Sequence, residues 1–355
     1  MRTMKNIKTV NIFFLIMLIS AFSIIADSKA DVRKEKKFNK QFKVNNSTLV
    51  TVKNKFGKVN IVPWNQNYVK IDVEVIVEAR NDDRADRLLE RISVEFTGSD
   101  NSSEVGAKTD MNGNMNTSKN EKFEINYEVK VPSSQPMSVR HQFGTLVIGD
   151  LKGKLDVSHQ HGNAMLGKVT GEGSTIELQF GDLDIEELSN AEVEIQHCGN
   201  VTIEKANNVE LESQHSNISF GEVSSVEIEL QHGKFHSDKL GSIEGDVQFS
   251  KFSIGTLTKS LSLDVQHTGS FKVDKVSGSV SNIELDVQFS SPTFHFENLN
   301  AWTMEIDVSH GKVSYPSGFT FQTVNEKSTS ATYRRNGGSG KKLSIDGQFS
   351  NVTLK

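Results

Sequence analysis

The sequence predicts an all-β fold: a single-stranded parallel β-helix with 17 or 18 residues in most turns. The first observation is a marker, Gln followed by Phe or His and then usually by Gly or Ser, which recurs between Ser174 and Ser270. Its Gln residues lie 17, 18, 17, 17 and 18 residues apart. A fixed period this short is typical of solenoids, in which each unit buries its apolar face only against its neighbours.

The second observation is the alternation of apolar residues within each unit. Val193 and Ile195 precede one marker with period two, and Leu183, Ile185 and Leu188 stand at the second, fourth and seventh places after another. This spacing predicts two short strands separated by a corner, which pair in parallel with the next unit at about 4.8 Å. The inward positions are denser than in left-handed hexapeptide helices, so we predict a right-handed winding.

Residues 1–30 are expected to be a secretory signal peptide. Arg2, Lys5 and Lys8 form a positive start, Ile12–Ile25 is apolar, and small residues place cleavage after Ala30. A retained membrane anchor is the alternative, although the apolar run is shorter than the roughly 20 residues that a span needs. We expect no transmembrane span after cleavage, and a location in the periplasm, on the outer surface or outside the cell.

Residues 31–135 are predicted to form a β-rich cap. A helix over 82–91, capped by Asp82 or Asp83, covers the open end of the stack, and a polar flexible loop follows over 98–120. The marker already appears at Phe56. Residues 136–355 are expected to hold the β-helix turns and a C-terminal cap, with Leu343, Ile345 and Phe349 in the last strand, which completes the far end.

An aromatic column is the first candidate site. Its parity matches that of the aliphatic residues, so we expect buried rings, stacked at the strand spacing. Its members are Phe143, His161, Phe180, His197, His215, His232, Phe249, His267, Phe289, His310 and Phe349. The metal-binding alternative is strongest for His141, His159 and His161, which share parity on adjoining turns and would converge on a transition metal.

Two further columns are expected to face outward. Gln142, Gln160, Gln179 and their successors can form an amide ladder. Two places before most Gln residues lies an acid, which gives a row of carboxylates. We expect either a solvated face that limits sheet association, or a strip that binds a cationic partner or Ca²⁺. The calcium candidates are Glu194, Glu212, Glu229, Asp246 and Asp264. No other cofactor is expected.

Several features together resemble a known group of proteins. They are the signal peptide, the Asn54-Lys55-Phe56-Gly57-Lys58-Val59 strand, Val131-Pro132 before the turns, and the repeated Gly-x-Φ-x-Φ units, where Φ is apolar. The chain resembles the exported bacterial candidate-adhesin families, which include autotransporter-head-like domains of unknown function common in Bacteroidetes. The likeness covers nearly the whole mature chain. It implies a β-solenoid and a surface or envelope location, and it brings no catalytic residues.

The sequence therefore favours a non-enzymatic exported protein that binds a cell-surface or extracellular glycan or protein. The motifs of zinc proteases, serine hydrolases and P-loop enzymes do not occur, and the single Cys198 cannot form a zinc-binding pair. A polysaccharide hydrolase or lyase that uses paired carboxylates stays open, as does a periplasmic ligand or stress sensor. The acidic face and the export signal disfavour nucleic-acid binding.

Overall fold

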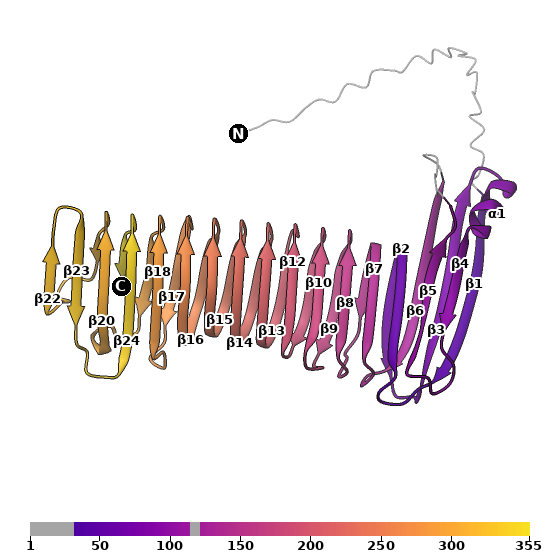
Figure 1. Cartoon of the computed structure of the whole chain (residues 1–355), viewed down its shortest axis with the longest axis horizontal. Helices are drawn as coiled ribbons and strands as arrows, with labels where there is room; N and C mark the ends of the chain where they lie inside the picture. The colour runs from indigo at the N-terminus through magenta and orange to yellow at the C-terminus, as the bar shows by residue number, and fades with distance from the viewer. Residues whose placement is uncertain (1–31, 114–120) are drawn as a thin grey trace, which may run out of the picture.

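The computed structural model describes residues 32–113 and 121–355, which form a long rod of β-strands (Figure 1). The predicted signal peptide and residues 114–120 of the predicted loop lie outside these ranges. The described residues form one connected set of 25 strands. The all-β class is as predicted. No helix in the described ranges has the length and apolar character needed to cross a bilayer.

The first part of the rod mixes parallel and antiparallel pairs. Its elements are β1 (Val32–Lys43), β2 (Leu49–Trp64), β3 (Tyr68–Ala79), α1 (Asp82–Glu90), β4 (Ile92–Thr97), β5 (Glu104–Met111) and β6 (Lys122–Pro132). β3 pairs antiparallel with β1 and β6, and β4 pairs antiparallel with β5. β2 pairs in parallel with β5, β6 and β7, and so joins this cap to the rod.

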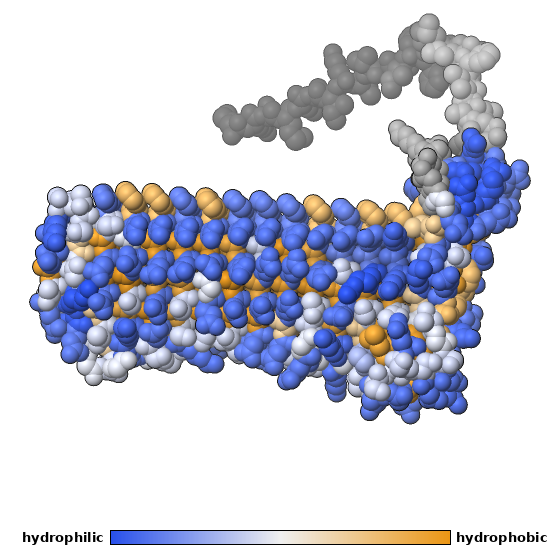
Figure 2. Space-filling view, viewed as in Figure 1, coloured by the Kyte–Doolittle hydropathy of each residue, from blue (hydrophilic) through white to orange (hydrophobic). Residues whose placement is uncertain are grey.

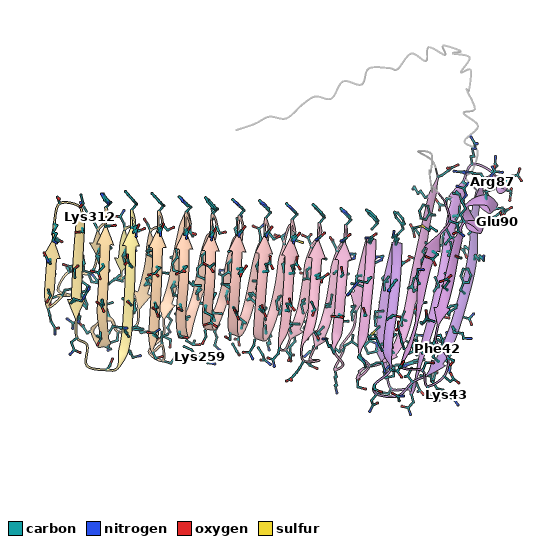
Figure 3. All side chains as sticks on the ribbon, viewed as in Figure 1. Phe42, Lys43, Arg87, Glu90, Lys259 and Lys312 are labelled. Carbon is teal, nitrogen blue, oxygen red and sulfur yellow. The ribbon has the colours of Figure 1, made fainter. Side chains whose placement is uncertain are left out.

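Two details of the cap differ from the sequence-based expectation. The side chain of Asn81, and not of Asp82 or Asp83, caps α1 by accepting a hydrogen bond from the backbone N–H of Arg84 at 2.9 Å. The predicted loop over 98–120 contains strand β5, because its polar residues pair with β2 and β4 at the cap. α1 packs against β3, β1 and β4 and buries Ala85 and Leu88. Its labelled residues Arg87 and Glu90 lie at the opposite edge of the cap from Phe42 and Lys43 (Figure 3).

The middle of the rod is parallel and in register. Its strands are β7 (Met137–Ile148), β8 (Leu155–Gln160), β9 (Ala164–Val169), β10 (Ser174–Gln179), β11 (Leu183–Leu188), β12 (Ala191–Gln196), β13 (Val201–Gln214), β14 (Asn217–Gln231), β15 (Lys234–Gln248), β16 (Lys251–Gln266), β17 (Ser270–Val276), β18 (Asn282–Gln288) and β19 (Pro292–Phe296). Each Gln of the marker lies opposite the Gln of the next unit, as Gln196 does with Gln214. Valine, isoleucine and leucine therefore stack on one another inside the rod.

The far end of the rod departs from the predicted order. Its elements are η1 (Leu299–Ala301), β20 (Trp302–Ser309), β21 (Val313–Ser314), β22 (Thr323–Glu326), β23 (Ser330–Arg335), β24 (Lys341–Gln348) and β25 (Val352–Leu354). β24 lies between β18 and β20, in parallel with both (Figure 1). The antiparallel hairpin β22–β23 therefore ends the rod, and the prediction that the strand with Leu343, Ile345 and Phe349 completes the far end is wrong.

Candidate functional site: an aromatic edge and an acidic face

Twelve aromatic rings form one continuous stack along an edge of the rod. Neighbouring ring centroids lie 4.7–5.2 Å apart, and the ring planes differ by 1–14°. We call it the aromatic edge. In spatial order it consists of Phe56, Phe143, His161, Phe180, His197, His215, His232, Phe249, His267, Phe289, Phe349 and His310.

The rings lie outside the rod, so the prediction that they are buried is wrong. The phenylalanines of the aromatic edge other than Phe56 are 43–52% exposed, and Figure 2 shows hydrophobic and hydrophilic side chains mixed along this edge. The reason is the backbone: all twelve residues have φ between 50° and 64°. A residue in the left-handed region interrupts the strand alternation on which the prediction relied. This conformation costs about 1–2 kcal/mol for a residue other than glycine, and ring stacking offsets part of it.

The residue after each ring points toward the interior or has no side chain. Ser250 is buried; its Oγ donates to the Gln248 carbonyl at 2.6 Å and accepts from the Gly233 N–H at 3.1 Å. Where the residue is glycine, space is the reason: a Cβ on Gly162 would meet the carbonyl oxygen of Gly144. The preference for Gly or Ser after the ring was the sequence signal for this corner, and parity alone missed it.

The Gln column borders the aromatic edge. Side-chain amides link Gln142 to Gln160 at 3.0 Å, Gln160 to Gln179 at 3.4 Å and Gln179 to Gln196 at 3.2 Å. Gln196 instead donates to Glu194 at 2.7 Å. The predicted amide ladder is therefore present from Gln142 to Gln196.

The predicted acidic column is in register and faces solvent. Its members lie opposite one another on successive strands: Glu177, Glu194, Glu212, Glu229, Asp246, Asp264, Asp286, Asp346 and Asp307. We call it the acidic column. Rows of hydrophilic side chains run along this face beneath the aromatic edge (Figure 2).

Two aspartates near one end of the acidic column, Asp286 and Asp307, have pKa values that are shifted in opposite directions. Partial burial, followed by the charges of Asp264, Asp346 and Glu284, raises the pKa of Asp286. A hydrogen bond from the Arg334 guanidinium at 2.7 Å lowers the pKa of Asp307. Arg334 thus neutralises the end of a column that is otherwise like-charged.

The metal candidates are arranged less favourably than the sequence suggested. Within the described ranges, no group of three or more His, Cys, Asp or Glu residues is placed to hold a metal ion. The five calcium candidates lie on adjacent strands in a flat row, and their assignment stays a prediction that calcium titration tests.

The three histidines proposed for a transition metal do not converge. His141 and His159 are buried and stacked, with centroids 5.0 Å apart, whereas His161 lies in the aromatic edge between Phe143 and Phe180. Burial lowers the pKa of His141 to about 4 and also lowers that of His159. The Nε2 of His141 lies 3.1 Å from the carbonyl oxygen of Gly57, so the backbone provides a hydrogen-bond partner for this imidazole. The left-handed corner at His161 separates it from the pair.

Comparisons with known proteins give few matches. No family model and no curated protein matches the chain. Among solved structures, a candidate cell adhesion protein from Clostridium sporogenes is similar at 11% identity and a TM-score of 0.20, with 91% of this chain and 99% of that one covered. A candidate adhesin from Parabacteroides merdae is similar at 9% identity and a TM-score of 0.30, with 90% and 96% covered. One from Parabacteroides distasonis reaches 11% identity and a TM-score of 0.30, with 90% and 97% covered. At these TM-scores we rest no argument on the likeness.

Proposed function

We propose that the protein is an exported, non-enzymatic β-solenoid adhesin with a right-handed winding. It presents an extended surface to a glycan or protein of a cell envelope or the extracellular space. The observation that carries this proposal is the aromatic edge, whose eleven steps of 4.7–5.2 Å place its end rings roughly 50 Å apart. A protein that acted on one small molecule would need a single concave site, whereas this surface repeats one chemistry along its length.

The aromatic edge offers ring edges and not ring faces. Each inner ring has a neighbour stacked on both faces, as His215 has His197 and His232. The exposed rim of a Phe ring carries partial positive charge and hydrocarbon, and the exposed rim of a His ring carries nitrogen atoms that donate or accept hydrogen bonds. An extended partner that lies along the edge meets these groups beside the Gln amides at every unit.

The rigidity of the edge favours binding. Each ring is held by a fixed corner of the backbone and by its two neighbours, so little side-chain freedom is lost when a partner binds. The acidic column beside the edge selects against polyanions, and nucleic acid is therefore not an expected partner.

A binding experiment tests this function. The mature protein is screened by surface plasmon resonance against an array of cell-surface glycans and extracellular proteins. A variant with Phe180→Asn, Phe249→Asn and Phe289→Asn keeps residues that tolerate positive φ and removes three hydrocarbon rims. We expect it to bind the captured partner at least about tenfold more weakly, a loss of about 1.4 kcal/mol.

The control removes exposed apolar side chains elsewhere. Met165→Asn with Val324→Asn replaces side chains that are 45% and 46% exposed and lie outside the aromatic edge. Unchanged binding by the triple Phe variant, or an equal loss in the control, would contradict the proposal.

One observation favours a second candidate, an enzyme that acts on polysaccharides. The pKa of Asp286 is raised and that of Asp307 is lowered, and one strand separates the two residues. Such a pair can divide the roles of acid and base, and inverting glycosidases hold these carboxyls roughly 6.5–9.5 Å apart. A reducing-sugar assay over a polysaccharide panel decides between the two functions: turnover that Asp286→Asn abolishes would establish the enzyme.

A further inference from the structure

A cavity of about 670 Å³ lies where β2, β5 and β7 meet, at the start of the rod. Its volume falls in the range of about 300–1,000 Å³ that is typical of small-ligand sites. Four cationic side chains line it, those of Lys53, Lys55, Lys108 and Arg140. Asp110 is the acidic residue of the lining.

The strand register brings three of the cations together. Lys53 lies directly opposite Lys108 on β5 and directly opposite Arg140 on β7. Like charges directly opposite on neighbouring strands destabilise the pair unless a counter-charge is bound. The cluster is therefore an arrangement that an anion would stabilise.

Among the residues that the structure describes, most of this positive charge has no acidic partner. Lys108 contacts Asp110 at 2.7 Å and Glu95 at 3.8 Å. Lys53, Lys55 and Arg140 form no ion pair within the described ranges. The Arg140 guanidinium reaches only the backbone carbonyls of Val139 and Asp156, at 3.4 Å and 3.5 Å.

Lys108, Lys53 and Arg140 occupy the same column that is acidic over the rest of the rod, whereas Lys55 lies in the Gln column. From Arg140 the register passes to Ser158 and then to Glu177, the first member of the acidic column. The sign of the charge thus changes within two strands. A general solvation pattern would continue along the column, whereas a local reversal beside a cavity indicates a distinct site.

We propose that this cavity, the basic cavity, binds the carboxylate or sulfate group of an acidic oligosaccharide. The guanidinium of Arg140 offers two parallel donors that match either anion, and Lys53 and Lys55 add point charges. Three neutral polar residues of the lining, Ser158, Gln142 and Gln160, supply hydroxyl and amide groups for sugar hydroxyls. An acidic peptide would engage the cations and leave most of these groups unused, so the lining favours the saccharide.

Phe56 and Phe143 of the aromatic edge also line the basic cavity, but the residues replaced in the triple Phe variant do not. The triple Phe variant described above leaves its cations in place. Loss of binding to an extended partner and loss of binding to a short acidic sugar are therefore separate outcomes.

Isothermal titration of the mature protein tests the proposal. The probes are trigalacturonate, which carries carboxylates, a sulfated chondroitin disaccharide, neutral maltotriose, inorganic phosphate and hexaglutamate. We expect binding of at least one acidic sugar, with an affinity that falls as salt rises. The variant Lys53→Gln with Arg140→Gln should weaken this binding at least about tenfold.

A matched pair of lysines provides the control. Lys234 and Lys251 are exposed and lie directly opposite each other on β15 and β16. Lys234→Gln with Lys251→Gln removes the same charge from an equivalent cross-strand pair, and it should leave the affinity within about twofold.

Four results would overturn the proposal. They are no heat from either acidic sugar, equal binding of maltotriose, and binding of phosphate or hexaglutamate as tight as that of the sugars. The fourth is salt-sensitive self-association, measured by sedimentation, that the Lys53/Arg140 variant abolishes, because the acidic column of a second copy would then be the occupant.

Discussion

The rod contains two aromatic columns, and they follow opposite rules. The inner column holds three buried phenylalanines in register, Phe235, Phe252 and Phe271, and its next positions are the apolar Ile218 and Pro292. The aromatic edge is exposed, mixes Phe with His, and has positive φ at every member. Both stack at nearly the same spacing, 4.7–4.9 Å for the inner column and 4.7–5.2 Å for the edge.

The comparison shows that stacking distance does not report burial. In both columns the strand spacing sets the distance between rings. What differs is the local backbone, because a corner residue turns its side chain away from the interior. A column in which His replaces Phe freely is one whose rings stay in contact with water, since a buried imidazole needs hydrogen-bond partners.

The largest expected change in stability comes from replacing one ring in each column with alanine. Phe252→Ala removes a fully buried ring and should lower the free energy of unfolding by about 3–5 kcal/mol. Phe249→Ala removes a half-exposed ring three residues earlier and should lower it by about 1 kcal/mol or less, chiefly through lost stacking. Chemical denaturation measures both. Equal losses would mean that the edge is part of the core.

Exchanging Phe for His sharpens the same contrast. Phe252→His places an imidazole in the apolar interior, and the buried polar group without a partner should lower the free energy of unfolding by about 1–3 kcal/mol. Phe249→His restores the His stacking found at neighbouring units and should change it by less than about 0.5 kcal/mol. A thermal melt of each variant checks which substitution destabilises the protein more. An unchanged melting temperature for Phe252→His would contradict the distinction between a buried and an exposed column.

The hydroxyl that fixes the corner should matter less than an inner ring. Ser250→Ala leaves the Gly233 N–H and the Gln248 carbonyl without this partner and should lower the free energy of unfolding by about 1–2 kcal/mol. Ser237 is the control, because its Oγ is buried and has no hydrogen-bond partner in the described ranges. Ser237→Ala should be neutral or stabilising, and a reversed order would contradict this account of the corner.

The smallest effects are expected from two carboxylates in the acidic column. The raised pKa of Asp286 means that its charge opposes folding at neutral pH, and this opposition disappears as pH falls below about 3.9. The lowered pKa of Asp307 means that its charge supports folding above about 3.9, and the support is lost as pH falls through its folded pKa.

Neutral substitutions should therefore act in opposite directions. At pH 7, Asp286→Asn should raise the free energy of unfolding and Asp307→Asn should lower it, each by about 0.2–1 kcal/mol, because solvent screens both groups. The gain from Asp286→Asn should vanish in acid. Denaturation at pH 7 and pH 3 tests the signs, and a gain from Asp307→Asn would show that Arg334 contributes nothing.

Much of the fold could be predicted because the sequence is periodic. The spacing of Gln196 and Gln214 gave the register, and the parity of Glu212 correctly placed the acidic column outside. The strand alternation gave the wrong side for His161, because a single residue with positive φ turns this side chain out of the rod. Strand β5 was missed as well, although Val105, Ala107 and Met111 alternate along it, because the Gly, Asn and Ser residues around this short strand predict a loop.

The sequence showed only part of the basic cavity. Lys53 and Arg140 lie two places before the marker or its equivalent, which is the position that Glu or Asp occupies in later units, so the spacing of the sequence alone places them in one column. Lys108 joins them only through the pairing of β2 with β5, a contact between residues that no periodic pattern connects.

The insertion of β24 between β18 and β20 means that one of the last strands of the chain holds the end of the rod together. β20 comes after β18 and β19 in the chain, yet β18 and β20 do not pair with each other, because β24 lies between them and pairs with both. The pairing of β18 with β24 joins residues about 60 apart in the sequence, and contacts over such a separation are slow to form. A chain cut before residue 341 would leave an open parallel edge on β18, ready to pair with another chain. Closure of the rod is thereby coupled to the presence of its last strands.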